Sequence, residues 1–190
     1  DGVIGTMMEP VVLPEMKTDE EVAAIKESKK SWACIGHSLD EQRSWIEPGH
    51  WRTEDMQKAN EDAAAMYERW AKEDVQVEEY MVDDAEVVIA AYGISARVSK
   101  SVVDILRAEG KKIGLIRPIT VHPFPYESFE KLDYSKVKAI LDVEMSIPAQ
   151  LIYDVKMAVK DRCPIETCLC SGGNVIKRGD VLEAARKLFE

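Results

Sequence analysis

The chain has 190 residues, enough for one domain or for one domain with an appendage. Its formal net charge of −10 argues against a nucleic-acid-binding surface, which would need a basic face. The sequence contains no apolar run near the roughly 20 residues of a membrane-spanning helix, and no charged-then-apolar leader. We therefore expect a cytoplasmic protein with neither a nucleic-acid partner nor a membrane partner.

The first residues are expected to be the end of a preceding domain. Asp1-Gly2 and the apolar stretch that follows have no partner strand before them, so we expect residues 1–14 to be the tail of a missing domain. A boundary within a disordered leader is the alternative. Thr18 to Lys30 then predicts a helix, with Thr18 or Asp19 as its N-cap and a thin apolar face.

A tryptophan-rich stretch and a second helix complete an N-terminal arm, which we assign to residues 15–83. Residues 31–53 predict a long ordered loop whose tryptophans pack on another surface, either of this domain or of the missing one. Thr53 to Lys72 predicts a helix. Its stripe of methionine and aromatic residues favours core contact over a cofactor site. Residues 75–82 are expected to link this helix to the first strand.

Residues 84–125 carry the clearest structural pattern. The apolar run from Val87 to Tyr92 ends at Gly93, an amphipathic helix follows from Ala96 to Glu109, and a second apolar run spans Ile113 to Ile116. This order predicts two parallel strands joined by a right-handed helical crossover.

The remaining elements continue the alternation of helix and strand. We expect a short helix, a third strand, a helix opened by Pro148, a fourth strand and a last helix, at residues 126–132, 137–143, from 148, 164–170 and 179–189. The predicted fold class is α/β: a three-layer α/β/α sandwich with a mostly parallel sheet over residues 84–190, plus the N-terminal helical arm.

The four cysteines give little support to a metal site. We expect reduced thiols, because no signal segment directs the chain to an oxidising compartment. Cys163, Cys168 and Cys170 lack the C-x-x-C spacing of zinc and iron–sulfur sites. Cys34 with two nearby histidines, His37 and His50, offers only three candidate ligands without a repeated spacing. We therefore expect no metal in this chain.

In open α/β sheets, ligands lie outside the carboxyl ends of the strands, which here places residues 93–97 and 117–120 at the candidate edge. The turn at Gly93 leads into a helix N-terminus, where free N–H groups can receive an anion. It has a single glycine, however, and matches neither G-x-G-x-x-G nor the Walker pattern. A plain strand-to-helix turn is the favoured interpretation.

Several longer strings carry a family resemblance. VEEYMVDDAEVVIAAYGISARVSKSVV, GLIRPITVHPFP and AILDVEMSIPAQL closely resemble the alpha-type subunit of the 2-oxoacid:ferredoxin oxidoreductases, nearest to the 2-ketoisovalerate members. The opening DGVIGTMMEPVVLP resembles the exit of that subunit's first domain. The resemblance covers most of the chain and is weakest from Lys17 to Asp74.

The resemblance implies the second domain of that subunit, similar to the transketolase C-terminal domain. It implies a complete enzyme with thiamine diphosphate, magnesium and iron–sulfur clusters, which converts a 2-oxoacid to an acyl-CoA with coenzyme A as co-substrate and ferredoxin as electron acceptor. The implied partners are a thiamine diphosphate-binding subunit, a gamma subunit and a ferredoxin-like subunit. This fragment is then expected to bind no cofactor and to hold no catalytic residue.

Two departures from the family pattern stand out. Ser146 occupies a position where relatives often have asparagine, although Gln150 is retained, so any polar role of that asparagine is in doubt. The turn at residues 171–173 lacks the arginine that relatives often carry before the glycines.

The candidate residues at the strand-end edge are Gly93, Ser95, Arg97, Arg117, His122 and Glu144. Arg117 is expected to pair with Glu144 or with another acid, and Glu144 has the alternative of a plain surface carboxylate. His122 is more simply a structural histidine than an acid–base group. The leading hypothesis is an oxidoreductase fragment with a structural and assembly role. The rival is a non-enzymatic interaction or small-anion-binding module of the same fold.

Overall fold

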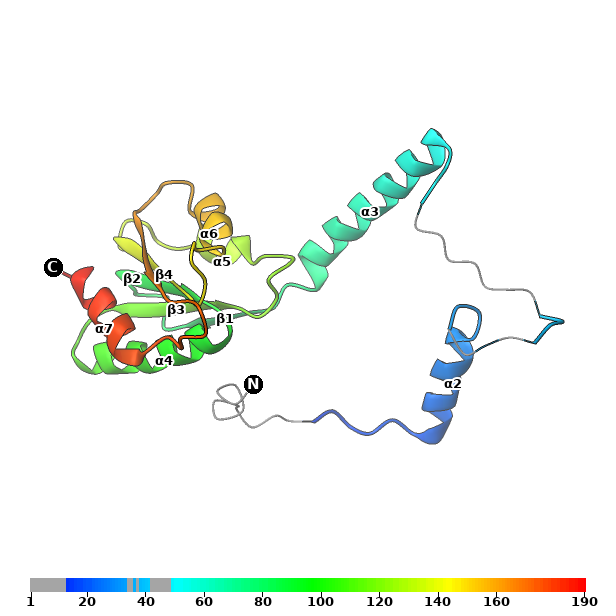
Figure 1. The fold of residues 1–190 in the computed structure, drawn as a ribbon. Coiled ribbons are helices and arrows are strands. Elements are labelled where there is room, and N and C mark those ends of the chain that lie inside the picture. Colours follow the sequence, from blue (N-terminus) through cyan, green and yellow to red (C-terminus); the bar gives the residue numbers. More distant parts are fainter. Residues whose placement is uncertain (1–12, 34–35, 37, 42–48) are drawn as a thin grey trace. The chain divides into compact units, whose positions relative to one another are not determined.

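A computed structural model describes residues 13–33, 36, 38–41 and 49–190 (Figure 1). Within the described residues the chain forms two compact units, one of residues 13–65 and one of residues 66–190. The boundary falls inside a helix. Among the described residues, no helix combines the length and the apolar composition that crossing a bilayer requires.

Two helices precede the sheet. Helix α2 spans Asp19–Lys29 and begins with a capping box: Thr18 Oγ accepts a hydrogen bond from the Glu21 amide at 3.2 Å, and a Glu21 carboxylate oxygen accepts one from the Thr18 amide at 2.8 Å. This confirms Thr18 as the N-cap. Helix α3 spans Thr53–Glu73.

The apolar stripe of α3 does not lie in a core. No residue of α3 is buried, and Met56 and Tyr67 are exposed. Near the end of the helix, Tyr67 packs against Trp70 with ring centroids 5.5 Å apart. The expectation of core contact along this stripe is therefore wrong for the described residues, because the amphipathic spacing defines an apolar face without supplying a partner for it.

The second unit is built on a five-stranded sheet of order β1-β3-β2-β4-β5. The strands are β1 (Val77–Tyr80), β2 (Val87–Ala91), β3 (Ile113–Pro118), β4 (Ala139–Glu144) and β5 (Ile165–Leu169). Strands β2, β3, β4 and β5 are parallel, and β1 runs antiparallel along β3. The mostly parallel sheet is confirmed, with β2 at its centre.

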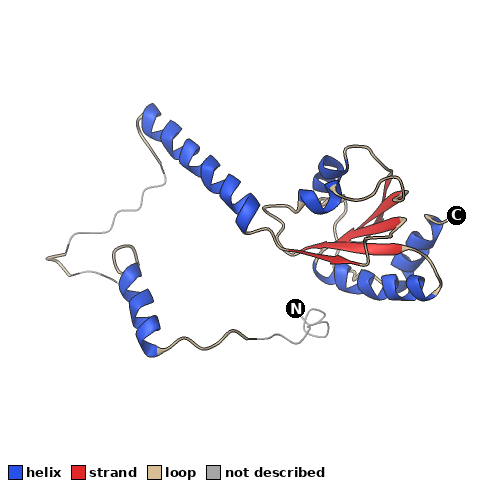
Figure 2. Ribbon diagram, turned by 180° about the vertical axis from the view of Figure 1, so that it is seen from behind, coloured by secondary structure: helices blue, strands red, loops and turns tan. Residues whose placement is uncertain are grey.

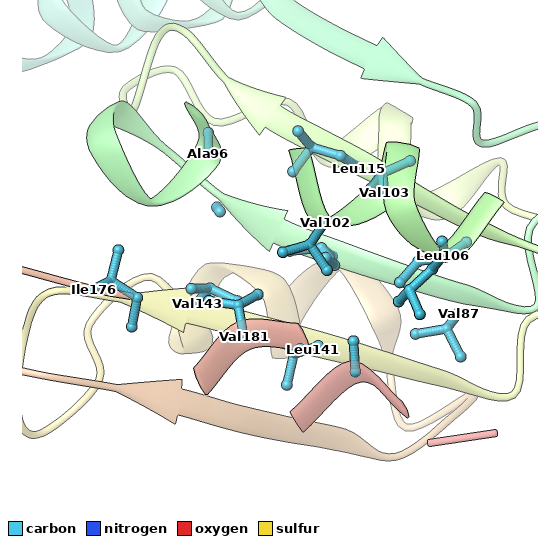
Figure 3. Close-up of a cluster of buried hydrophobic side chains, with 14 residues drawn as sticks. Val87, Ala96, Val102, Val103, Leu106, Leu115, Leu141, Val143, Ile176 and Val181 are labelled. Atoms are coloured by element: carbon cyan, nitrogen blue, oxygen red, sulfur yellow. The ribbon is translucent and has the colours of Figure 1, made fainter. Parts of the chain in front are cut away.

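Helices cover both faces of this sheet (Figure 2). Helix α4 (Gly93–Ala108) and helix α7 (Arg178–Lys187) pack on one face, and α5 (Tyr126–Glu130) and α6 (Ile152–Val159) pack on the other. Figure 3 shows the first of the two cores, in which Val103 and Leu106 of α4 meet Leu115 and Leu141 of the sheet. The expected three-layer α/β/α sandwich is confirmed.

Two local expectations are wrong. Val77–Tyr80 is an edge strand rather than part of a link: its two glutamates and short length hide the strand pattern. Helix α6 begins at Ile152 rather than at Pro148, and residues 145–151 form a loop between β4 and α6. A buried carboxylate accepts hydrogen bonds from the backbone amides at the end of this loop.

Candidate functional site at the carboxyl edge of the sheet

The turn after β2 is the first part of the expected edge. Gly93 has a φ of +54°, a left-handed conformation that glycine adopts without a Cβ penalty, and α4 begins directly there. Tyr92 is the N-cap, and its side chain makes no capping hydrogen bond. Ser95 is buried in the first turn of α4, and Arg97 is half-buried. The geometry is that of a strand-to-helix turn fixed by one glycine.

Arg117 lies near the end of β3 and is held by an acid on the neighbouring edge strand. It stands opposite Glu78 of β1, and its Nη1 lies 3.1 Å from Glu78 Oε2. Lys100 of α4 forms a second ion pair with the same carboxylate. The hydrogen bond from Lys100, with that from Arg117, holds the pKa of Glu78 below its usual range. The guanidinium is thus part of a structural ion-pair cluster.

Of the two expected partners of Arg117, Glu144 or another acid, the structure shows the other acid, Glu78. Strand β2 lies between β3 and β4, and side chains alternate between the faces of each strand. Arg117 shares the α4/α7 face with Leu115, whereas Glu144 shares the α5/α6 face with Ile140. The two charges therefore belong to opposite sides of the sheet.

Glu144 is fully buried, so its interpretation as a surface carboxylate is wrong. Its two oxygens accept hydrogen bonds from the Gln150 amide at 2.9 and 3.0 Å, and Oε1 accepts one from the Ile152 amide at 3.3 Å. The Ser146 hydroxyl donates to Oε2 at 2.8 Å. Burial alone would raise the pKa of Glu144, but the neighbouring Asp142 and the hydrogen bonds from the Gln150 amide and the Ser146 hydroxyl outweigh burial and lower it.

Asp142 is a second buried acid of β4 and is absent from the candidates expected from the sequence. It is fully buried two positions before Glu144 on β4, and among the described residues no hydrogen-bond donor contacts either of its carboxylate oxygens. Burial, together with the neighbouring Glu144, raises the pKa of Asp142 to about 8. The sequence feature that could have identified Asp142 is the acid-x-acid pattern Asp142-x-Glu144 at the end of an otherwise apolar strand.

His122 lies in the loop that follows β3. Its ring is exposed, and it meets the ring of Tyr67 edge to face with centroids 5.9 Å apart. The candidate edge residues therefore lie in four places: Gly93, Ser95 and Arg97 at the start of α4, Arg117 in the Glu78 cluster, His122 in the loop after β3, and Glu144 beneath the loop of residues 145–151.

The cysteines in the described part of the chain are free thiols. Cys163, Cys168 and Cys170 are half-buried, and burial raises the pKa of all three, which keeps them protonated at neutral pH. In the described ranges no three His, Cys, Asp or Glu side chains come together as metal ligands. Cys34 and His37 lie outside the described residues.

Large apolar side chains are exposed just beyond the carboxyl ends of three neighbouring parallel strands. We call this set the edge surface; its members are Tyr92 after β2, Ile119 and Val121 after β3, and Met145 and Ile147 after β4. Ile147 is the most exposed of them, at 62%. Exposed apolar side chains gathered in this way are typical of a surface that contacts another protein or domain.

The fold and the edge define an α/β domain with a mostly parallel sheet and an apolar carboxyl edge. Residues 85–181, just over half of the chain, match the family model of the pyruvate:ferredoxin oxidoreductase core domain II. The chain belongs to this family, which confirms the resemblance seen in the sequence.

The curated relatives are subunits of oxidoreductases. The chain is 37% identical over 188 residues to the ketoisovalerate oxidoreductase subunit VorB of Methanothermobacter marburgensis. The aligned region covers 99% of this chain and 51% of that subunit. The chain is 28% identical to the pyruvate synthase subunit PorA of Methanocaldococcus jannaschii, covering 95% of this chain and 51% of that subunit. The chain thus spans about half the length of these relatives.

A solved structure has the same fold at low sequence identity. A 2-oxoglutarate:ferredoxin oxidoreductase from Magnetococcus marinus, with 2-oxoglutarate, coenzyme A and succinyl-CoA bound, superposes with a TM-score of 0.66. The alignment has 16% identity and covers 83% of this chain and 28% of that one. At this identity the likeness concerns the fold.

Proposed function

We propose that this chain is part of a 2-oxoacid:ferredoxin oxidoreductase, which oxidatively decarboxylates a 2-oxoacid such as 2-ketoisovalerate to an acyl-CoA with ferredoxin as electron acceptor. The observation that carries the proposal is the family match over residues 85–181, joined to 37% identity along almost the whole chain with a ketoisovalerate oxidoreductase subunit. Family membership favours this function over a free-standing interaction or anion-binding module. The activity belongs to the assembled cytoplasmic enzyme.

Within that enzyme, we assign this fragment a structural and assembly role. Residues 1–14 are the tail of a preceding pyrimidine-binding domain, residues 15–83 an arm, and residues 84–190 a domain like the transketolase C-terminal domain. The end of the arm supplies β1 to the sheet, so Glu78 joins the arm to Arg117 of β3. This ion pair supports an arm that is anchored to the domain it precedes.

Catalysis and cofactor binding lie elsewhere in this proposal. Thiamine diphosphate and magnesium belong to a companion subunit, iron–sulfur clusters to a ferredoxin-like subunit, and a gamma subunit completes the assembly. The support comes from the charged candidates themselves. Both Glu144 oxygens accept backbone amides of this chain, and Arg117 is paired with Glu78, so both groups are engaged in intrachain contacts.

The edge surface is the part of the domain that we expect other parts of the enzyme to cover. Met145→Glu places a charge in this surface, whereas Met157→Glu makes the same change at an exposed methionine of α6, 58% exposed. In the complete enzyme we expect Met145→Glu to reduce co-purification of the partner subunits at least tenfold and Met157→Glu to leave it unchanged. Equal co-purification of both variants, each folded by circular dichroism, would refute the assignment of this surface.

A further inference from the structure

Strand β4 ends with two fully buried acids on one face of the sheet. Side chains two positions apart on a strand project to the same side, so Asp142 and Glu144 are neighbours beneath α6. Two ionised carboxylates in such a position repel each other, and burial removes the water that would stabilise both charges. A buried pair of this kind is stable when one of its members keeps a proton.

The surroundings decide which member keeps it. Glu144 accepts hydrogen bonds from two backbone amides and the Ser146 hydroxyl, an arrangement that favours the ionised form. Neither Asp142 oxygen contacts a donor among the described residues. An ionised Asp142 would leave its charge unsatisfied, whereas a protonated Asp142 has one O–H to donate, and Glu144 is the acceptor beside it.

We propose that Asp142 and Glu144 hold one proton between them at neutral pH, and that this acidic pair fixes the loop of residues 145–151 at the carboxyl edge of the sheet. Asp142 donates to Glu144, and Glu144 in turn binds the amides at the end of the loop. Asp142 is therefore a positioning residue that acts through Glu144. The loop held in this way carries Met145 and Ile147 of the edge surface.

The charged groups around the pair are consistent with a retained proton. Tyr92 lies at the β2–α4 turn: burial is the largest cause that raises its pKa, and the charges of Glu144 and Asp142 add to the effect. On α6, Asp154 accepts a hydrogen bond from the Tyr126 hydroxyl at 2.9 Å. On β5, the residue opposite Asp142 is the uncharged Thr167. None of these neighbouring groups in the described part of the chain is a cation that would stabilise an ionised Asp142.

The proposal predicts a specific pH dependence of folding. A carboxyl whose pKa is raised to about 8 in the folded chain holds a proton that the unfolded chain has already lost above about pH 4. Stability therefore falls as the pH rises from about 4 to about 8 and levels off beyond that. Asp142→Asn keeps a donor for Glu144 and removes this titration.

The first experiment compares urea unfolding of the 190-residue chain and its variants between pH 5.5 and 7.5. We expect the folding equilibrium constant of the wild-type chain, divided by that of Asp142→Asn, to fall about tenfold per pH unit, as one retained proton requires. Glu166→Gln, which changes an exposed carboxylate on neighbouring β5, is the control, and its ratio to wild type should change far less. Parallel profiles for wild type and Asp142→Asn would overturn the shared proton.

A second measurement uses only the wild-type chain, so it does not depend on whether a variant folds. Carbon-13 NMR of the wild-type chain, labelled at aspartate and glutamate carboxyls, should show one carboxyl that titrates near pH 8. If every carboxyl titrates below pH 6, the proposal is wrong.

Amide exchange tests the loop: the protection factor of the Gln150 amide should fall at least tenfold in Glu144→Ala but stay within threefold of wild type in Glu166→Gln. Unchanged protection in Glu144→Ala would show that the pair does not fix the loop.

Discussion

The alternation of side chains along each strand decides which charged residues at the carboxyl edge can meet. Arg117 and Glu144 both end apolar strands, and their charges are opposite, yet they project to opposite faces of the sheet. Each charge finds its partner locally instead: Arg117 binds Glu78 across the β1–β3 pair, and Glu144 binds the amides of its own loop. Both groups consequently have a clear structural role.

Removing the Arg117 side chain should cost modest stability. Arg117 and Glu78 are both about 70% shielded from solvent, so a coupling of about 1 kcal/mol is expected from a double-mutant cycle with Arg117→Ala and Glu78→Ala in urea. Because the pKa of Glu78 is lowered by its partners, this contribution is present above about pH 4.5 and is lost as the pH falls through the lowered pKa. The exposed pair Lys187–Glu183 is the control, with a smaller coupling expected. A cycle without coupling for Arg117 and Glu78 would contradict the assigned role.

At the scale of the elements, the sequence predicts the strands and helices whose own residues form an apolar run or an amphipathic pattern. The β2–α4–β3 unit follows from two apolar runs, two glycines and a helical stripe, and the structure confirms it. Strand β1 could not be recognised, because Glu78 and Glu79 occupy the middle of a four-residue strand whose stability comes from pairing with β3. Asp142 is not predicted for a related reason: it is buried on the sheet face that α5 and α6 cover, and that core forms only through tertiary contacts.

The close approach of β3 to the turn after β1 gives an element-scale prediction. A Cβ on Gly114 would lie 2.6 Å from the Met81 carbonyl oxygen and 2.9 Å from the Val82 Cα, both of them backbone atoms. Gly114→Ala should therefore destabilise the chain by about 1–3 kcal/mol in urea unfolding, the usual cost of overpacking.

Gly179→Ala in the first turn of α7 is the matched control. A Cβ there meets nothing within 4 Å, and the alanine should be neutral or stabilise the chain by about 0.5–1 kcal/mol. If both alanine variants have the same stability, β3 does not pack on the backbone of residues 81–82 in the way described.

At the scale of the whole molecule, the chain covers about half the length of the related subunits, and the family match over residues 85–181 lies within the sheet-containing unit of residues 66–190. The domain offers an apolar edge surface and two charged clusters that serve its own architecture. Such a domain is suited to holding neighbours in place. The chemistry of the enzyme is then expected from residues outside this chain.

This division of labour predicts that the isolated chain does not bind thiamine diphosphate tightly. Its sequence contains no GDG motif of the kind that supports magnesium and diphosphate in related enzymes. Calorimetric titration with thiamine diphosphate and magnesium should give no saturable heat at micromolar concentrations, while the complete enzyme binds under the same conditions. A dissociation constant in the micromolar range or below for the isolated chain would place part of the cofactor site here.

The central claim, that the carboxyl edge of this domain supports assembly rather than chemistry, is tested most directly by single-turnover decarboxylation in the complete enzyme. The variant is Arg117→Ala, and only fully assembled complex is measured. The account predicts a lower yield or thermal stability of the complex, with a decarboxylation rate within about threefold of wild type, a change of less than 1 kcal/mol in the barrier. A fully assembled, normally stable complex whose decarboxylation is slower by several orders of magnitude would contradict the account and make Arg117 a catalytic residue.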